Sequence, residues 1–348
     1  MTTTLMRRQE LALCFITMSA IFIIFNDEIS INLRAYSQVV SAESSFRQCP
    51  APAACGDTES VFELHCVQGS PARAVSHKYA VASLMLDVKI DPFVQRQYGF
   101  GLEMYVEHLR VLGYLIRSRG NLTCSVDMLL MVTSRPSAKH AQLLHAVGWS
   151  FVLVDSIRSP SNASKVLQGH RFQGVFTKLH IFNMTAYEGV LFLDADTIVL
   201  NSLRNMFDLY LPEMVRKKTH VAWCVDLAAN AANISEKNSG VLLVRPSAAL
   251  LADMMRSMYN EHFRFEKADQ GFLNDYVTRD MELVLPAEQY NCMLPETCFF
   301  ETKNTSIAHL TLVKPKSTMW QMRCWLNNIS SMCNAWTSYR RELEILNK

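Results

Sequence analysis

The sequence lacks several patterns that would place it in other classes of protein. Its formal net charge is +2 over 348 residues, and its one tight basic cluster, residues 216–218, has no interleaved aromatic residues. Both observations argue against nucleic-acid binding. It has no Cys-x-x-Cys or His-Glu-x-x-His pattern, which argues against a zinc site. With no internal repeat and 49% apolar residues, the chain is expected to bury one large core, with at most a small appendage.

An uncharged apolar stretch lies near the N-terminus, at residues 11–25, between Arg7-Arg8 and Asp27-Glu28. Its 15 residues are fewer than the roughly 20 that an average bilayer requires, so a cleaved signal peptide is an alternative to a signal anchor. No small-residue cleavage site follows directly, which favours the anchor. The preceding arginines place residues 1–10 in the cytosol. Either alternative sends the rest of the chain into the secretory lumen.

Six Asn-x-Ser/Thr sequons and ten cysteines agree with a luminal location. The sequons are at Asn121, Asn162, Asn183, Asn233, Asn304 and Asn328. Without Cys14, which is in the apolar stretch, nine cysteines remain, so at least one is unpaired or bonded to another chain. Cys224, inside the apolar segment VAWCV, is the predicted buried free thiol. Two pairs are close enough in sequence to form disulfides, although spacing does not determine connectivity: Cys292 with Cys298, and Cys324 with Cys333.

The remaining chain divides into three parts. Residues 26–75 carry prolines and glycines that interrupt any long periodicity, which predicts a stem. Residues 76–320 form the predicted α/β body, because strand-like and helix-like segments alternate, as in a mostly parallel sheet flanked by helices. Residues 321–348 form an extension to which the sequence assigns no role. The expected strands are residues 78–86, 127–132 and 150–154, and the expected helices are residues 102–116 and 138–147.

The segment VLFLDADTIVL, residues 190–200, places Asp194 and Asp196 two apart at the end of an apolar run. Side chains two apart on a strand leave from the same face, about 6.6 Å apart along the backbone, so both carboxylates can converge on one cation. Hard oxygen ligands suit Mg²⁺ or Mn²⁺ bound to a diphosphate. In such sheets ligands bind outside the carboxyl ends of the strands, where these aspartates fall. The alternative is an acidic turn that closes a core strand, and the motifs around it argue against that alternative.

Three segments in order, FTKLHIFNMTAYEGVLFLDADTIVL, KNSGVLLVRPS and ADQGFLNDY, resemble the glycogenin-like glycosyltransferase family 8. The resemblance covers about residues 79–315 and is strongest over residues 172–276. Several motifs in the right order are more specific than any one of them. The resemblance implies the GT-A fold, a Rossmann-like mostly parallel sheet, and a retaining transfer from a nucleotide-diphospho-sugar donor. It also implies Mn²⁺ as the metal, with Mg²⁺ as the alternative.

Carried over residue by residue, the resemblance implies that Asp194, Asp196 and His309 hold the metal. A nucleoside diphosphate leaving group gains negative charge as the anomeric bond breaks, and a metal acting as a Lewis acid stabilises that charge. Lys178 is placed near the donor's diphosphate or sugar, where an ammonium group would add fixed positive charge. Its alternative is a solvated helix lysine. His309 has the alternative of a structural histidine on an apolar segment.

The resemblance also gives roles around the donor sugar. Asn238 and Ser239 would contact sugar hydroxyls, and Gly240 would let the backbone approach the ligand closely. The alternative is an ordinary turn before a strand. Asp269 would orient a sugar hydroxyl, or cap the helix that follows, or both, and Gln270 would stabilise an oxocarbenium-like centre. The residues implied to bind the nucleotide-sugar are Asp194, Ala195, Asp196, Asn238, Ser239, Gly240 and Lys314, with Asp269, Gln270 and Lys178 as catalytic residues.

The chain departs from the family pattern near the end of the body. Family members commonly read His-x-x-Gly-x-x-Lys-Pro-Trp, whereas this chain reads HLTLVKPK, one residue shorter and without the glycine or the tryptophan. The roles of Lys314 and His309 therefore depend on the tertiary structure. Asp226, which ends VAWCVD, matches a sugar-contacting aspartate loosely, because an insertion precedes Asn238.

The resulting hypothesis is a Golgi or endoplasmic reticulum enzyme, single-pass with a luminal catalytic domain, or secreted after signal cleavage. It would move a hexose or related sugar from a UDP-sugar to a luminal glycan or glycoprotein. Front-face attack and a covalent intermediate are both open as mechanisms. One alternative is an inactive luminal protein of the same fold that binds glycans or sugar nucleotides. A sugar nucleotidyltransferase is less suited, because the first strand is followed by DVKIDPF and not by a glycine-rich basic loop.

Overall fold

The computed structural model describes residues 78–86, 101–122, 126–160, 174–227, 235–260, 263–264, 267–293, 304–311 and 330–346. The predicted cytosolic tail, residues 1–10, the apolar stretch, residues 11–25, and the stem, residues 26–75, lie outside these ranges. Among the helices that are described, none combines the length and the hydropathy needed to cross a bilayer.

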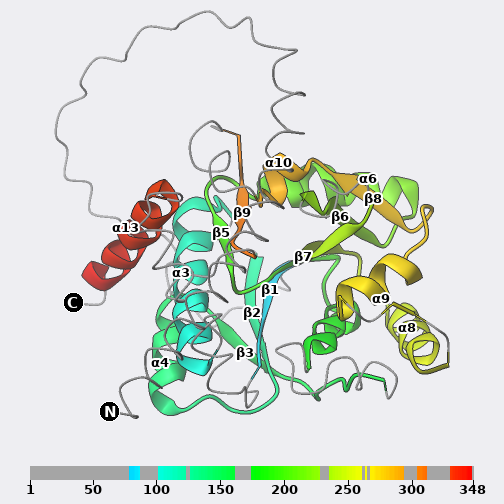
Figure 1. Ribbon diagram of the computed structural model, residues 1–348, viewed down its shortest axis with the longest axis horizontal. Coiled ribbons are helices and arrows are strands. Elements are labelled where there is room, and N and C mark those ends of the chain that lie inside the picture. The colour runs from blue at the N-terminus through cyan, green and yellow to red at the C-terminus, as the bar shows by residue number, and fades with distance from the viewer. Residues whose placement is uncertain are drawn as a thin grey trace, which may run out of the picture. The chain divides into compact units, whose positions relative to one another are not determined.

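The core of the described region is a seven-stranded sheet of order β3-β2-β1-β4-β7-β6-β8. β7 runs antiparallel to both of its neighbours, β4 and β6, and the other four pairings are parallel, so the sheet is mostly parallel. A two-stranded sheet lies beside it (Figure 1), formed by β5 (Thr197–Val199) and β9 (Ile307–His309). The strands of the large sheet are β1 (Tyr79–Met85), β2 (Val126–Val132), β3 (Ser150–Leu153), β4 (Gly189–Leu193), β6 (Val221–Val225), β7 (Lys237–Val244) and β8 (Glu282–Leu285).

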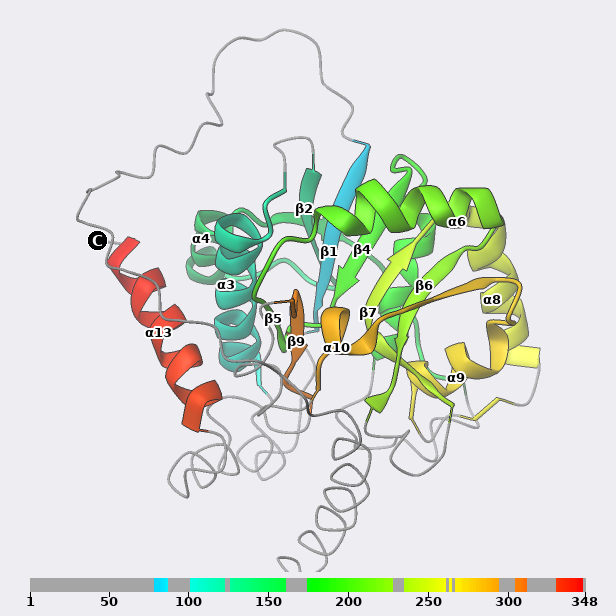
Figure 2. The same ribbon diagram turned by 90° about the horizontal axis from the view of Figure 1, so that it is seen from above.

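Helices cover both faces of this sheet (Figures 1 and 2). Successive residues of a strand point to opposite faces, and in β4 Leu191 packs in one apolar cluster while Val190 and Phe192 pack in the other. The first cluster contains residues of α3 (Leu102–Arg119), α4 (Ala138–Ala146), η2 (Met206–Tyr210), α6 (Leu211–Lys217), α10 (Ala287–Tyr290) and α13 (Ser330–Leu346). The second contains residues of η1 (Val175–Asn183), α8 (Ala248–Asn260) and α9 (Asp269–Tyr276).

Strands that are buried on both faces explain why the sequence pattern was readable. Such strands form continuous apolar runs, as the buried β1 does. β1, β2 and β3 all lie within one or two residues of the expected segments, although β3 is only partly buried. The expected helix at residues 102–116 corresponds to α3, and its apolar positions Leu109, Leu112 and Ile116 are buried. The predicted α/β body with a mostly parallel sheet flanked by helices is therefore confirmed.

The C-terminal extension, to which the sequence assigned no role, contains α13, which packs along α3 (Figure 2). Trp336 makes an edge contact with His108, at a ring-centroid distance of 5.3 Å. Tyr114 of α3 donates a hydrogen bond of 3.0 Å to Glu342. The buried Trp336 and its neighbours on the same face add apolar area to the core, so this helix contributes to the stability of the body.

Candidate metal centre and active site

Asp194 and Asp196 lie between two strands, which corrects the single strand expected over residues 190–200. β4 ends at Leu193, and β5 begins at Thr197 in the other sheet. A turn joins the strands: the Thr197 backbone N–H and hydroxyl both donate to the Asp194 carbonyl, at 3.0 and 2.8 Å. The two carboxylates are therefore brought close by a turn between sheets and not by the two-residue period of a strand.

The antiparallel direction of β7 brings its first residues to the same end of the sheet as Asp194. Leu193 pairs with Val241, and the Asp194 N–H donates to the Gly240 carbonyl at 2.8 Å. Asn238, Ser239 and Gly240 thus belong to β7 itself, and the alternative of an ordinary turn before the strand is wrong. The expected position outside the carboxyl ends of the parallel strands is confirmed for the aspartates.

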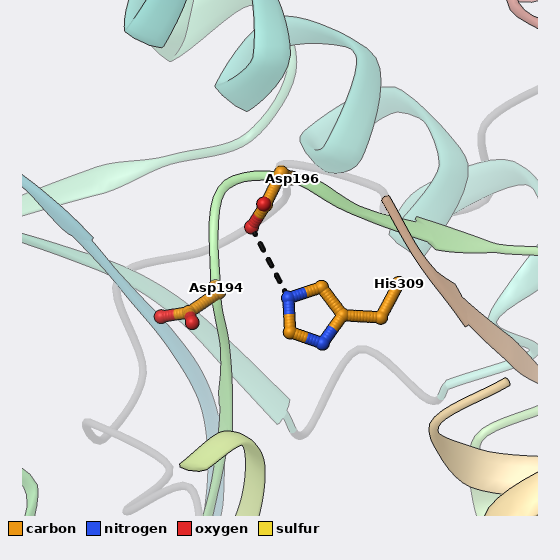
Figure 3. Close-up of side chains that lie close together, drawn as sticks. All are labelled: Asp194, Asp196 and His309. Carbon is orange, nitrogen blue, oxygen red and sulfur yellow. Dashed lines mark ion pairs between the residues drawn. The ribbon is translucent and has the colours of Figure 1, made fainter. Parts of the chain in front are cut away.

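The small sheet places His309 against the aspartates. Thr197 of β5 pairs with His309 of β9, and the Leu310 N–H donates to the Asp196 carbonyl at 2.9 Å. The Nε2 atom of His309 lies 3.4 Å from Oδ1 of Asp196, and both side chains are buried. Figure 3 shows the Asp196 carboxylate pointing at the ring, whereas the Asp194 carboxylate points to the other side of the chain trace.

Gly240 makes room for His309. A β-carbon at this glycine would lie 2.2 Å from Cε1 of the imidazole ring, a distance at which one of the two groups has to move. The sequence predicted that Gly240 allows close approach to a ligand, and the group that approaches it in the structure is the His309 ring. A residue with any side chain here would displace the ring from Asp196.

These three residues fit a divalent cation. One potential ligand atom from each of Asp194, Asp196 and His309 lies within 4.8 Å of the others. Opposite ligands of an octahedral ion with bonds of about 2.1 Å are roughly 4.2 Å apart, so these separations are close to those that one ion requires. Two carboxylates and one imidazole can hold a divalent cation, and three protein ligands leave coordination positions open.

Lys178 of η1 is buried behind the metal centre. Its Nζ lies 2.9 Å from Oδ2 of Asp269 and 3.2 Å from Oδ1 of Asp194, and it donates to the Ser239 carbonyl at 3.2 Å. Burial alone would lower the pKa of Lys178, but the two carboxylates more than offset this and raise it. An ammonium group has three N–H donors, and three protein oxygens face this one. The alternative of a solvated helix lysine is wrong, whereas the expected diphosphate contact stays a prediction.

The carboxyl group of Asp194 is affected by several neighbours. Its partial burial among the site residues raises its pKa, Lys178 acts in the opposite direction, and Asp196 raises it further. The net effect is a raised pKa. This is the expected result of placing several carboxylates at one site with a single ammonium group, and a divalent cation at the same place would favour the ionised form.

Asp269 is held by two donors. Its Oδ2 accepts a hydrogen bond of 2.7 Å from the Ser239 hydroxyl and faces Lys178. α9 begins at Asp269, its N-cap residue is Ala268, and no side chain caps it by a hydrogen bond. The capping role that the sequence offered for Asp269 is therefore not seen, and the carboxylate instead joins η1, β7 and α9 at the site.

A chain of side-chain hydrogen bonds fixes Gln270. Its Oε1 accepts from Asn238 at 3.1 Å, and its Nε2 donates to Asp226 at 2.8 Å. Asn238 also accepts, through Oδ1, from the Gly240 N–H at 2.9 Å. Asp226, which matches the family pattern only loosely in sequence, is buried and lies at this site through its contact with Gln270. Because both ends of the Gln270 amide are bonded, its orientation is fixed.

Other predicted residues are located as follows. Ala195 is buried in an apolar cluster, and its expected contact with the nucleotide stays a prediction. Lys314 lies outside the described residues.

Cys224 is a buried free cysteine, as predicted, and burial raises the pKa of its thiol. Cys292 and Cys333 are disulfide-bonded, whereas their expected partners, Cys298 and Cys324, lie outside the described residues.

Asn291 is a site residue that the sequence motifs did not predict. Its Oδ1 lies 2.9 Å from Nδ1 of His309, on the side of the ring that faces away from the aspartates. Asn291 is fully buried. It occurs in the segment AEQYNCM, which carries none of the family motifs, so only the position of His309 in space reveals it.

Comparisons with known proteins agree with the motifs. No protein-family model matches the chain. Inositol phosphorylceramide glucuronosyltransferase 1 of Arabidopsis thaliana is 31% identical over 277 residues, 72% of this chain and 46% of that protein. Putative UDP-glucuronate:xylan alpha-glucuronosyltransferase 4 of the same plant is 30% identical over 50% of this chain and 27% of that protein. Glycogenin-1 of Mus musculus is 28% identical over 46% of this chain and 45% of that protein.

The chain spans less than half the length of each of these relatives. Among solved structures, the galactosyltransferase LgtC in complex with donor and acceptor sugar analogs aligns with a TM-score of 0.48 and 14% identity, over 72% of this chain and 95% of that chain. A likeness of this size adds nothing to the architecture described above. The curated relatives confirm the resemblance carried by the three motif segments: the homologues of this chain are glycosyltransferases of the glycogenin-like type.

Proposed function

We propose that this chain is a metal-dependent retaining glycosyltransferase that takes a hexose or related sugar from a UDP-sugar. The observation that carries the proposal is the convergence of Asp194, Asp196 and His309 beside a second group formed by Asp269 and Gln270. The first group suits a cation and a diphosphate, and the second suits a sugar ring. A UDP-sugar contains both a diphosphate and a sugar ring, so it would occupy both groups of residues.

The residues of the chain have distinct tasks in this proposal. A bound Mn²⁺ would act as a Lewis acid on the diphosphate leaving group. Asp196 and His309 would hold the metal, and the pairing of β5 with β9 fixes their separation. Asp269, whose Oδ2 is engaged by Lys178 and Ser239, orients a sugar hydroxyl with its remaining oxygen lone pairs. Because this carboxylate is already held by two donors, it is better suited to orientation than to nucleophilic attack, which supports front-face attack.

The names of the relatives guide the choice of donor. Two of those reported above are glucuronosyltransferases, and one of these names UDP-glucuronate as its donor. We therefore propose UDP-glucuronate as the first donor to test, followed by UDP-glucose, UDP-galactose and UDP-xylose. The acceptors named for these relatives, inositol phosphorylceramide and xylan, differ in chemistry, so the acceptor is proposed only as a luminal glycan, glycolipid or glycoprotein.

The proposed location is the Golgi or endoplasmic reticulum membrane, with the body in the lumen. The apolar stretch at residues 11–25, the preceding arginines and the six sequons support this location. Secretion after signal cleavage is the alternative that the same residues allow.

The test is UDP release by the purified full-length chain with each donor, with Mn²⁺ or with EDTA. We expect one donor to give strong Mn²⁺-dependent release and the chain with Asp194→Ala to give none. A melting temperature raised by Mn²⁺ and UDP without turnover of any donor would favour an inactive binding protein. Release that persists in EDTA would contradict the metal assignment.

A further inference from the structure

Asn291 is held beside His309 by backbone hydrogen bonds. It follows α10, and its N–H donates to the Ala287 carbonyl at 2.9 Å. The next residue, Cys292, pairs with Ala308 of β9 in an isolated parallel bridge, and the His309 N–H donates to the Cys292 carbonyl at 2.8 Å. The segment that carries Asn291 is thus in register with the strand that carries His309, and the disulfide of Cys292 adds a covalent restraint.

The side-chain contact indicates where the ring of His309 carries a hydrogen. An amide oxygen only accepts hydrogen bonds, so Oδ1 of Asn291, 2.9 Å from Nδ1 of His309, requires a hydrogen on Nδ1. In the neutral ring the other nitrogen, Nε2, then carries the lone pair. Nε2 is the atom that faces Asp196 at 3.4 Å (Figure 3). This tautomer is the one that binds a metal through Nε2.

This contact leaves one donor of the amide unused. Among the residues that the structure describes, the buried Nδ2 atom of Asn291 has no hydrogen-bond partner. A buried unpaired amide donor costs about 1–3 kcal/mol. An apolar residue of the same size would avoid that cost, so the stability of the fold does not explain an asparagine here.

We propose that Asn291 is a positioning residue that holds His309 in the Nδ1–H tautomer and aims Nε2 at the cation. The inference deepens the proposed function, since it rests on a metal bound by Asp194, Asp196 and His309. Partners of this kind on a ligating histidine typically change metal affinity by 10–100-fold when they are removed. Asn291 does not touch the metal, so its effect passes through the ring alone.

Two substitutions of Asn291 by residues of similar size separate the role of the amide oxygen from that of the amide nitrogen. Asn291→Leu removes the acceptor, and we expect the Kd for Mn²⁺, measured by calorimetry on the full-length chain with UDP present, to rise about 10–100-fold. Asn291→Asp keeps an oxygen facing Nδ1 and removes the unpaired donor. We expect it to bind Mn²⁺ at least as tightly as the wild type.

Thr305→Val is the matched control. Thr305 is also buried, and its hydroxyl donates to the Glu288 carbonyl of α10 at 3.0 Å. This variant loses a buried hydrogen bond in the same part of the structure without touching the imidazole. We expect it to lower the melting temperature without metal and to leave the Kd for Mn²⁺ unchanged.

Nitrogen-15 NMR of the imidazole in the metal-free wild type gives an independent readout, with the His309 signals assigned by comparison with His309→Gln. We expect Nδ1 to have a pyrrole-type shift and Nε2 a pyridine-type shift. The reverse pattern would overturn the inference, because the ring would then present an N–H to the metal. This measurement needs no variant of Asn291 to fold.

The outcomes also separate this inference from the proposed function. If the wild type binds Mn²⁺ and Asn291→Leu binds it equally well, the positioning role is wrong and the metal site stands. A tenfold or larger loss of affinity in Asn291→Asp would overturn the role as well. If the wild type binds no Mn²⁺ in the presence of UDP, both the metal site and the role of Asn291 are wrong.

Discussion

The ammonium group of Lys178 lies 2.9 Å from the carboxylate of Asp269, and both side chains are buried. The same ammonium group lies 3.2 Å from Oδ1 of Asp194. One buried cation therefore joins an aspartate of the metal side to the aspartate of the proposed sugar side. Lys178 is in η1 and Asp269 is in α9, so no single segment of the sequence contains this contact.

Lys178→Met should strongly destabilise the fold. Removing the cation leaves two carboxylates without their partner, and breaking a buried ion pair in this way typically costs about 3–5 kcal/mol. The measurement is the free energy of unfolding in urea. Lys267→Met is the control, because the ion pair of Lys267 with Glu236 is partly exposed and such pairs contribute less than about 1 kcal/mol. Equal losses in the two variants would contradict the role of Lys178.

The stabilising effect of Lys178 should persist through neutral pH and weaken in strong alkali. Its pKa in the folded chain is raised above the ordinary 10.5. A raised lysine pKa contributes stability that is fully present below the pKa of the unfolded chain and is lost as pH rises through the folded value. The difference in unfolding free energy between wild type and Lys178→Met should thus be constant from pH 7 to 9 and narrow above pH 10.5. A difference that already narrows below pH 9 would be inconsistent with this pKa.

Asp196→Asn should abolish metal-dependent turnover while leaving the fold intact. The backbone contact that joins Asp196 to β9 uses its carbonyl and is unaffected by the substitution. Loss of a ligand to a Lewis acid worth several kcal/mol should lower Mn²⁺-dependent UDP release at least about 100-fold. Asp208→Asn, on the exposed surface of η2, is the control. Undiminished Mn²⁺-dependent UDP release by Asp196→Asn would contradict the metal assignment.

Gly240→Ala should weaken Mn²⁺ binding by displacing the His309 ring. The new β-carbon would lie 2.2 Å from Cε1 of that ring, so the ring has to move away from Asp196. Gly189→Ala is the matched control, since its β-carbon would meet the Leu211 side chain at 2.6 Å in the core. Both variants should lose about 1–3 kcal/mol to overpacking, and only Gly240→Ala should raise the Kd for Mn²⁺. An unchanged Kd would show that the ring does not ligate the cation.

Enzymatic removal of N-glycans should lower the apparent mass of the chain isolated from secretory cells. The sequon residues Asn121, Asn183 and Asn304 are all exposed, so a glycan at each would extend into solvent. Replacing each by Gln should remove one step of the shift on a denaturing gel. A chain that shows no shift at all would contradict the luminal location.

Local sequence determined most of the α/β body. Strands buried on both faces require unbroken apolar runs, and the amphipathic helix that became α3 requires apolar residues at helical spacing. Those constraints act on residues that are close in sequence, so the strands and helices could be predicted from the sequence. The motifs that carry the family resemblance were visible for the same reason, because each occupies one short segment.

The site itself was decided by the tertiary structure. The turn between β4 and β5, the antiparallel insertion of β7 and the pairing of β5 with β9 bring together residues that are more than one hundred positions apart, such as Asp194 and His309. The tautomer of His309, the burial of Lys178 and the need for a glycine at position 240 depend on which atoms meet in space. Hydrophobic patterning fixes which face of each element is buried, whereas the contacts among polar side chains at the end of a sheet depend on how the elements are stacked and on the direction of each strand.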